Sequence, residues 1–255
     1  MIHSIDPAAC TGCGTCTKTC PLDVFRLEPA QEALSPCMAA CPAGVDIRGN
    51  HYLIQQGHLG EAARRYRIVQ PFPAITGRVC FHPCEEKCAR NHVDEAVNIN
   101  AVEQIMGDWD LKAPLEKPAR RHITKVAVIG SGPAGLSCAW FLAQMGYPVT
   151  VFEAMPLPGG MLRYGIPAYR LPDAIVAAHI ARLEAMGIAF RCNTKIGEGA
   201  DLSLSDLKRL GFKAVMLAPG TTVSRKVRME GVELPGVHWG LEFLRANRGD
   251  EQPRL

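Results

Sequence analysis

A glycine-rich turn between a strand and a helix constrains the fold of this chain more than any other stretch. The run KVAVI at 125–129, apolar from Val126 onward, predicts a buried strand of the parallel kind, and it leads directly into the spacing G-x-G-x-x-G. Residues 136–146 then predict a helix, and residues 147–153 predict a second strand that ends at Glu153. This order of elements indicates a dinucleotide-binding βαβ unit.

The residues of this turn have expected roles in holding a pyrophosphate. Gly130 permits the tight turn, Gly132 lets the backbone approach the phosphates, and Gly135 lets helix and strand pack closely. The helix N-terminus offers free amides, and Glu153 accepts hydrogen bonds from a ribose diol. The predicted cofactor-binding residues of this unit are Gly130, Ser131, Gly132, Pro133, Ala134, Gly135 and Glu153. The fingerprint by itself does not distinguish FAD from a nicotinamide cofactor.

A run of four cysteines near the N-terminus is the second strong constraint. Cys10, Cys13, Cys16 and Cys20 follow the spacing C-x2-C-x2-C-x3-C, and a proline comes directly after them. This spacing is typical of 4Fe-4S ligation, in which the fourth cysteine often binds a different cluster. The alternatives are a disulfide knot and a zinc knuckle, but zinc sites usually have two separated C-x2-C pairs. We therefore expect an iron-sulfur motif here.

Composition limits the classes to which the chain can belong. Nine of its eleven cysteines precede residue 90, and its first residues lack the charged and apolar pattern of a secretory signal. Many cysteines without an export signal indicate reduced thiols and metal sites rather than disulfides. The net charge of +3 is too small to indicate nucleic-acid binding, and no apolar run is long enough to span a bilayer. We expect a cytoplasmic protein.

Five more cysteines lie between residues 37 and 88. Cys37 and Cys41 are spaced C-x3-C and followed by proline, and Cys80, Cys84 and Cys88 are spaced C-x3-C-x3-C. If this stretch were helical, the last three thiols would point to the same side. Their number and spacing make all five candidate metal ligands.

Helical patterns surround these cysteines. Residues 51–69 predict two short helices, because apolar positions recur at helical spacing and glycines interrupt them. A further helix is expected over 97–112, and it carries Glu103. His51 and His58 are expected to be solvated helix residues rather than ligands, because no cysteine has a suitable spacing beside them.

The segments PCMAACPAGVDI, GRVCFHPCEEKC and VNINAVEQIMGD, in this order, resemble the N-terminal iron-sulfur domain of the glutamate synthase small subunit family. Related domains open dihydropyrimidine dehydrogenase and similar flavin-dependent ferredoxin:NADP oxidoreductases. The resemblance implies an all-helical domain with two 4Fe-4S clusters. It implies that one cluster is held by Cys41, Cys80, Cys84 and Glu103, and that the other uses Cys37 and Cys88.

One difference from the family affects the second cluster. Family members carry a further C-x2-C pair shortly before the position of Cys37, where this chain has EPAQEALS. Either the opening motif supplies the missing ligands, or it forms a cluster of its own. In the second case, Cys37 and Cys88 are less firmly assigned as cluster ligands. Two clusters fit the available ligands, and a third would need ligands that are not evident. The simplest alternative for Cys37 or Cys88 is a free buried thiol.

The second half of the chain also resembles this family. The stretch PLPGGMLRYGIPAYRLP is similar to a loop of its flavin domain, which implies FAD as the cofactor. The resemblance places further residues along the FAD, namely Gly160, Leu162, Arg170, Ala218 and Gly220. A guanidinium suits the phosphates because it makes bidentate contacts with their oxygens. Relatives continue into a second glycine-rich fingerprint for NADPH, so we expect an incomplete FAD domain here and a nicotinamide site supplied by another chain, or else a fragment.

These features predict an α+β chain in four segments: a ferredoxin-like motif at 1–30, a helical 4Fe-4S domain at 31–112, a linker at 113–124 and a Rossmann-like FAD-binding domain at 125–255. The predicted function is an electron-transfer subunit that passes electrons between FAD and 4Fe-4S clusters. The expected partners are other redox subunits, a chain that completes the FAD and NADPH domains, and ferredoxin or another low-potential acceptor. The alternatives are a non-catalytic iron-sulfur adaptor and a zinc-dependent interaction module.

Overall fold

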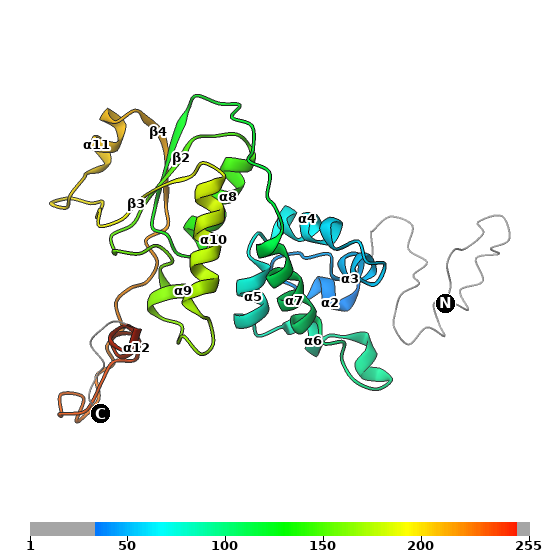
Figure 1. Cartoon of the computed structure of the whole chain (residues 1–255). Coiled ribbons are helices and arrows are strands. Elements are labelled where there is room, and N and C mark those ends of the chain that lie inside the picture. Colours follow the sequence, from blue (N-terminus) through cyan, green and yellow to red (C-terminus); the bar gives the residue numbers. More distant parts are fainter. Residues whose placement is uncertain (1–33, 249–255) are drawn as a thin grey trace. The chain divides into compact units, whose positions relative to one another are not determined.

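The structure is a computed structural model that describes residues 34–248. The chain divides into two compact units between Gly107 and Asp108 (Figure 1). The opening motif at 1–30, with its four predicted ligands from Cys10 to Cys20, lies outside the described residues. No helix within residues 34–248 is long and apolar enough to cross a membrane.

The first unit is built from short helices, three of which begin at prolines. Pro36, Pro73 and Pro83 each occupy a first helical turn, where the missing N–H of proline removes no helical hydrogen bond. The elements of this unit are α2 (Pro36–Ala39), α3 (Ile47–Gln55), α4 (Leu59–Val69), α5 (Pro73–Val79), α6 (Pro83–Glu86), the 3-10 helix η1 (Ala89–His92) and α7 (Ile99–Lys112).

A small apolar core holds these helices together. Helix α3 packs against α4, and Tyr66 of α4 is buried in the same cluster as Ile99 and Met106 of α7. Helices α5 and α7 cross with their backbones in contact, because a Cβ on Gly77 would lie 2.5 Å from the Gln104 Cα. The two helices approach this closely only because glycine has no side chain.

The expectation that Cys80, Cys84 and Cys88 lie on one side of a helix is wrong. Cys80 follows α5 in extended conformation, Cys84 lies in α6, and Cys88 is extended before η1. His82 adopts the left-handed conformation with φ of 45°, and Pro83 begins a new helix. A proline cannot continue the preceding helix, since it lacks the N–H and fixes its own φ. The three thiols therefore come from three separate elements.

The second unit is a four-stranded parallel sheet with helices packed on it. The sheet has the order β3-β2-β1-β4, and β1 pairs in parallel with both β2 and β4. Its elements are β1 (Lys125–Ile129), α8 (Pro133–Gln144), β2 (Val149–Phe152), α9 (Met161–Tyr164), α10 (Asp173–Ala185), β3 (Ala189–Arg191), α11 (Leu204–Arg209), β4 (Phe212–Leu217) and α12 (Gly240–Arg248). The predicted βαβ unit is thus confirmed, with α8 crossing between β1 and β2.

The two inner strands and the edge strand β4 differ in burial. Val126, Ala127 and Val128 of β1 are buried, as expected for a central parallel strand. In β4 only Phe212 is buried, and its ring meets Phe152 edge-on at 5.6 Å between centroids. Apart from Lys213, the rest of β4 is apolar in sequence but exposed, including Leu217 at 60%. Within the described residues, this edge of the sheet is therefore uncovered.

Candidate functional site

The glycine turn after β1 has the shape that a dinucleotide requires. Gly130 has a φ of 98°, and a Cβ there would overlap with the carbonyl oxygen of Ala218. A Cβ on Gly135 would overlap with the carbonyl oxygen of Gly130, so the turn and the start of α8 are in backbone contact. Nothing lies within 4 Å of the position of a Cβ on Gly132. The surface over Gly132, at the N-terminus of α8, is therefore open to a phosphate.

The carboxylate of Glu153 lies beside this turn and already has protein partners. Its Oε2 accepts hydrogen bonds from the Ser131 N–H, at 3.0 Å, and from the Ser131 hydroxyl. Its Oε1 accepts from the Met155 N–H at 2.9 Å. A carboxylate has about four acceptor positions, so roughly one of them remains for a ribose hydroxyl. The residue is buried, with 7% of its surface exposed.

A second loop packs against the turn and forms its wall. The Ser131 hydroxyl accepts a hydrogen bond from the Gly159 N–H at 2.8 Å. A Cβ on Gly160 would lie 2.7 Å from the Gly132 Cα, so the two loops touch through their backbones. The bridge from Glu153 through Ser131 to Gly159 was not predicted from the sequence, because it depends on how the second loop returns to the first.

The remaining predicted FAD residues have different surroundings. The Ala218 N–H donates to the Ile129 carbonyl at 2.8 Å, which fixes the end of β4 beside the turn. Leu162 is buried in the unit, whereas Arg170 and Gly220 are exposed. The structure brings Gly130, Ser131, Gly132, Glu153, Gly160 and Ala218 together around the turn. It does not place the Arg170 side chain against them.

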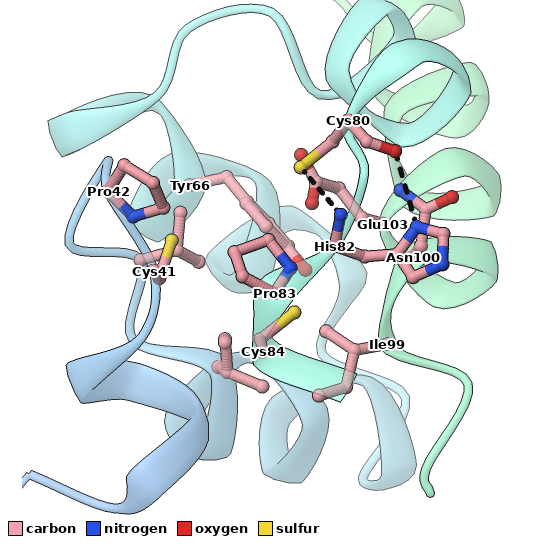
Figure 2. A pocket seen from close by; sticks show the side chains of 12 residues that line it. Cys41, Pro42, Tyr66, Cys80, His82, Pro83, Cys84, Ile99, Asn100 and Glu103 are labelled. Carbon is pink, nitrogen blue, oxygen red and sulfur yellow. Dashed lines mark hydrogen bonds between the residues drawn. The ribbon is translucent and has the colours of Figure 1, made fainter. Parts of the chain in front are cut away.

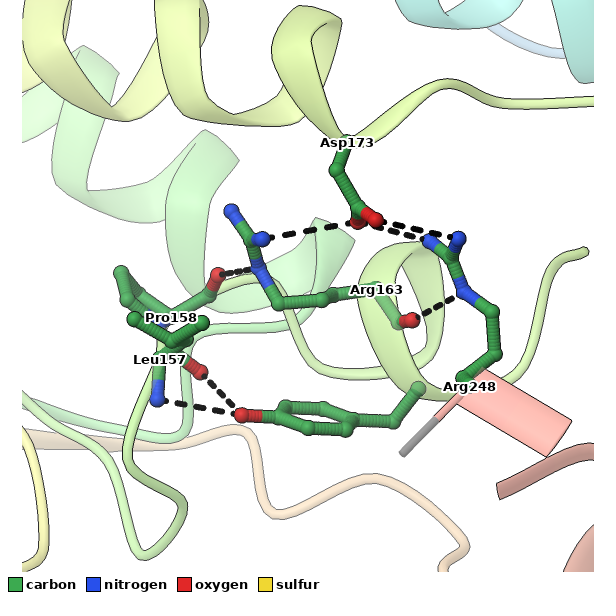
Figure 3. Close-up of polar contacts among 6 residues, drawn as sticks. Leu157, Pro158, Arg163, Asp173 and Arg248 are labelled. Carbon is green, nitrogen blue, oxygen red and sulfur yellow. Dashed lines mark hydrogen bonds and ion pairs between the residues drawn. The ribbon is translucent and has the colours of Figure 1, made fainter. Parts of the chain in front are cut away.

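An ion-pair network anchors the loop that carries Gly160 (Figure 3). The Arg248 guanidinium donates to both carboxylate oxygens of Asp173, at 2.9 and 3.2 Å, and to the Arg163 carbonyl at 2.6 Å. Arg163 pairs with the same carboxylate at 3.4 Å and donates to the Pro158 carbonyl at 3.0 Å. The Tyr164 hydroxyl bonds the backbone of Leu157. This network links α12, α9 and the start of α10, and no sequence pattern predicted it.

In the helical unit, the four ligands implied for one cluster line a single pocket (Figure 2). Cys41 follows α2, Cys80 follows α5, Cys84 lies in α6 and Glu103 in α7. The walls between these donors are largely apolar, and they include Val45, Ile47, Tyr66, Pro83 and Ile99. Pro83 begins α6 between Cys80 and Cys84, so these two donors reach the pocket from different elements.

Hydrogen bonds orient Glu103 within this pocket. The Gln70 side-chain amide donates to Oε1 at 2.7 Å, and the Thr76 hydroxyl donates to the same oxygen. Burial raises the pKa of Glu103, and the two hydrogen bonds partly oppose this shift. Because both bonds fall on Oε1, Oε2 is the oxygen that can serve as a ligand. The backbone N–H of His82 similarly donates to Cys80 Sγ at 3.3 Å.

The electrostatics of the pocket favour a cationic group. Burial raises the pKa of the Cys84 thiol to about 12, and the negative charges of Glu85, Cys41 and Cys80 add to the shift. Burial and then the charges of Glu103, Cys84 and Cys41 raise the pKa of Tyr66 well above its ordinary value. The Tyr66 hydroxyl is buried and has no hydrogen-bond partner among the described residues. Several acidic donors on apolar walls fit an iron-sulfur cluster, whose iron binds thiolates.

Cys37 and Cys88 line a second pocket, of about 320 Å³. The Ser35 hydroxyl lies 3.2 Å from Cys37 Sγ and shares a hydrogen bond with it. The expectation that His51 is solvated is wrong, because His51 lines this pocket and its Nε2 is buried without a hydrogen-bond partner in the described chain. His58 is more than half exposed and lies near Glu61, as expected for a surface residue.

Single-ion geometry is not present at either pocket. Across residues 34–248, no three histidine, cysteine or acidic side chains lie close enough together to hold one metal ion. A four-iron cluster sets its thiolates farther apart than a single ion does, so donors spread around one pocket suit a cluster rather than a single ion. All seven cysteines within the described part are free thiols, including the half-buried Cys138 and Cys192.

Comparison with sequence families divides the chain in the same way. Residues 3–26 match the family described as 4Fe-4S binding domain. Residues 31–114 match dihydropyrimidine dehydrogenase domain II, 4Fe-4S cluster. Residues 124–251 match pyridine nucleotide-disulphide oxidoreductase. The predicted fold class, a helical iron-sulfur domain followed by an α/β flavin domain, is confirmed, as are FAD and 4Fe-4S clusters as the cofactors of such domains.

Curated relatives are similar over most of this chain. The NADPH-Fe(3+) oxidoreductase subunit beta of Geobacter sulfurreducens is 40% identical, over 88% of this chain and 34% of the relative. The NADP(+)-dependent formate dehydrogenase subunit beta of Moorella thermoacetica is 36% identical, over 87% of this chain and 34% of the relative. The glutamate synthase [NADPH] small chain of Bacillus subtilis is 36% identical, over 86% of this chain and 48% of the relative.

The chain spans about a third of the length of the first two relatives and about half of the third. The family matches and the relatives agree with the two units seen in the structure, one helical with cysteine-lined pockets and one a parallel sheet with a glycine turn. The chain belongs to the family of flavin- and iron-sulfur-dependent oxidoreductases that includes the glutamate synthase small chain and dihydropyrimidine dehydrogenase.

Proposed function

We propose that this chain is an electron-transfer subunit of an oxidoreductase complex, in which FAD exchanges electrons with 4Fe-4S clusters. The observation that carries the proposal is the presence of two complementary sites in one chain. One is a glycine turn that is open over Gly132, and the other is a pocket of three thiols and a carboxyl. A flavin takes up electrons in pairs, and clusters carry them singly, so the two cofactors together connect hydride donors to one-electron acceptors.

The residues of the α/β unit bind and orient the FAD in this proposal. The free amides at the start of α8 bind the pyrophosphate, and the absence of a side chain at Gly132 allows the close approach. The Glu153 Oε1 atom accepts a hydrogen bond from a ribose hydroxyl at its remaining acceptor position. Ser131 fixes the turn, because its hydroxyl joins Glu153 to the Gly159 loop. Arg170 is exposed and free to turn toward the phosphates.

The residues of the helical unit hold the clusters in this proposal. Cys41, Cys80, Cys84 and the Glu103 Oε2 are the ligands in the first pocket. Cys37 and Cys88 contribute to a second cluster. The apolar walls exclude water, which strengthens the attraction between cationic iron and anionic ligands. The backbone N–H of His82 tunes the first cluster, since hydrogen bonds to sulfur change reduction potentials.

A partner surface on the α/β unit supports the assignment to a complex. Within residues 34–248, strand β4 is an unpaired edge of the sheet, and its apolar side chains from Ala214 to Leu217 are exposed. Exposed apolar edges of this kind are normally covered, because they otherwise promote unwanted strand pairing. We propose that a polypeptide segment carrying the nicotinamide site covers it, and that electrons pass between NAD(P)H and a low-potential acceptor such as ferredoxin.

Purification under anoxia tests this function directly. The full chain is isolated without oxygen, and its iron, acid-labile sulfide, zinc and flavin are measured together with any copurifying chain. We expect iron and sulfide in equal amounts, bound FAD, and a second redox polypeptide. Zinc without sulfide would contradict the proposal and favour an interaction module.

A non-catalytic iron-sulfur adaptor is the second candidate. It is favoured by the hydrogen bonds that already occupy most acceptor positions of Glu153. The adaptor predicts a chain that contains iron and sulfide but no flavin, even after incubation with excess FAD. The electron-transfer subunit predicts that its clusters are reduced by a hydride donor only when FAD is bound.

A further inference from the structure

We propose that His51 ligates the cluster held by Cys37 and Cys88, through its Nε2 atom. This inference rests on the proposed cluster domain and deepens it. A four-iron cluster takes one protein ligand for each iron, so Cys37 and Cys88 supply two and His51 would supply a third, while the fourth is not among the described lining residues. The histidine of α3 is the residue of the described chain that meets the requirements of a third ligand at this pocket.

The spacing of residues on α3 directs His51 toward the two cysteines. Ile47, His51 and Gln55 are separated by four positions each, so they lie on one face of the helix. All three line the pocket that also contains Cys37 and Cys88. Helix α3 packs against α2, the element that carries Cys37. The histidine ring is therefore placed on the same cavity wall as the two thiols.

The Nε2 atom of His51 is not used by any hydrogen bond of the described fold. It is buried, and no hydrogen-bond partner is present for it in residues 34–248. Burying an imidazole nitrogen without a partner is unfavourable, so native structures usually pair such an atom with a polar group, a water or a metal. His51 lines the cavity together with two thiols, so its unpartnered Nε2 is explained if an iron atom is its partner.

Other side chains of the pocket do not compete for this role. Apart from Cys37, Cys88 and His51, the described lining consists of Ile47, Arg48, Tyr52, Gln55, Val97 and Ile99, none of which is a usual iron ligand. Arg48 is exposed and brings a positive charge to the pocket, which complements the anionic sulfur of a cluster. The Ser35 hydroxyl bonds Cys37 Sγ and so orients one thiolate toward the cavity.

Histidine ligation would make the reduction potentials of the two clusters differ. A neutral imidazole in place of a thiolate leaves less negative charge on the cluster and raises its reduction potential, as the histidine-ligated Rieske centres show. The cluster at Cys37 and Cys88 would then be the easier of the two to reduce. The other cluster, held by the three thiolates of Cys41, Cys80 and Cys84 and the carboxylate of Glu103, would have the lower potential.

The experiment uses the full chain, grown with 15N-labelled histidine and reconstituted under anoxia with iron and sulfide. Pulsed electron paramagnetic resonance of the dithionite-reduced protein detects nitrogen bonded directly to a cluster. We expect a 15N coupling in the wild-type chain and in the His58→Ala control, and no such coupling in His51→Cys. His51→Cys should retain its iron and shift one cluster to lower potential in a redox titration. His51→Ala should lose the iron and sulfide of one cluster.

Two outcomes overturn the inference in distinguishable ways. If the wild-type chain holds clusters but shows no directly bonded nitrogen, His51 is not a ligand and the proposed function still holds. If the chain takes up no iron and sulfide, the proposed function fails together with this inference. The wild-type measurement is decisive even if His51→Ala does not fold, because it needs no variant.

Discussion

The two units of this chain build their binding sites in opposite ways. The α/β unit uses the backbone of six consecutive residues, where the decisive property is the absence of a Cβ at Gly130, Gly132 and Gly135. The helical unit uses side-chain donors from four elements, and Cys41 and Glu103 are far apart in sequence. The first site is therefore sensitive to shape and the second to chemistry. A single added methyl group should therefore weaken FAD binding at the glycine turn. A nearly isosteric change of donor atom should remove a cluster from the helical unit.

The largest effect is expected from replacing one sulfur with oxygen in the first pocket. Cys84→Ser keeps the size of this buried residue but removes a thiolate, so the variant should lose the iron and sulfide of one cluster. Iron and sulfide analysis after anaerobic reconstitution measures the loss. Cys138→Ser, at a half-buried thiol of α8, is the matched control and should retain every cluster. Full iron content in Cys84→Ser would remove this residue from the ligand set.

The second effect concerns shape alone. Gly132 has a φ of −70° and open space around the position of its Cβ, so Gly132→Ala should fold with a free energy of unfolding within about 0.5 kcal/mol of wild type. The added methyl group would meet the pyrophosphate, and FAD affinity should fall about tenfold or more. Fluorescence titration of FAD into the flavin-free chain measures this change. Gly197→Ala, whose Cβ would meet only Ala200 at 3.9 Å, should bind FAD normally. Equal affinities in the two variants would contradict the backbone site.

The difference between the sites also explains what the sequence could reveal. Because the glycine turn is contiguous, its spacing and the flanking strands predict both the fold and the place of the site. The cluster pocket could be assigned only through the family resemblance, because the spacing of Cys80, Cys84 and Cys88 suggested one helical face, which Pro83 prevents. Spacing shows which residues share a face, but it does not show what packs against that face.

His51 illustrates the same limit. Its four-residue spacing from Ile47 and Gln55 is visible in the sequence and could have indicated a shared helix face. The cysteines that meet this face lie on α2 and before η1, and their positions depend on the packing of the whole unit. The bridge from Glu153 to Gly159 through Ser131 is likewise a property of two loops that meet only in the folded chain.

A smaller effect is expected from the protonation of Glu103 in the metal-free chain. Burial raises its folded-state pKa above the ordinary 4.5, so its contribution to stability is fully present below about pH 4.5 and is lost as the pH rises through the raised value. Glu103→Gln does not ionise, and it should lose less free energy of unfolding than wild type across this window. Urea unfolding of the metal-free chain at several pH values measures the difference. Glu61→Gln, at an exposed carboxyl of α4, is the control. Parallel pH profiles for wild type and Glu103→Gln would contradict the prediction.

The smallest effect should come from the side chains that support the shape-dependent site from outside it. Arg248 is 5% exposed and pairs with both oxygens of Asp173, whose side chain is 53% exposed. Solvent screening at the exposed carboxylate limits the value of this pair, so Arg248→Ala should lower the free energy of unfolding by only about 1 kcal/mol. Its local effect should be larger, because α12 would lose its bonds to Asp173 and to the Arg163 carbonyl, and limited proteolysis should cleave near α12 sooner. Arg209→Ala, which removes an exposed ion pair with Asp206, should leave that cleavage unchanged. If both variants are cleaved at the wild-type rate, the network does not anchor α12. The glycine loops would then be held by their own backbone contacts and by the bridge from Glu153 through Ser131 to Gly159, without support from α12.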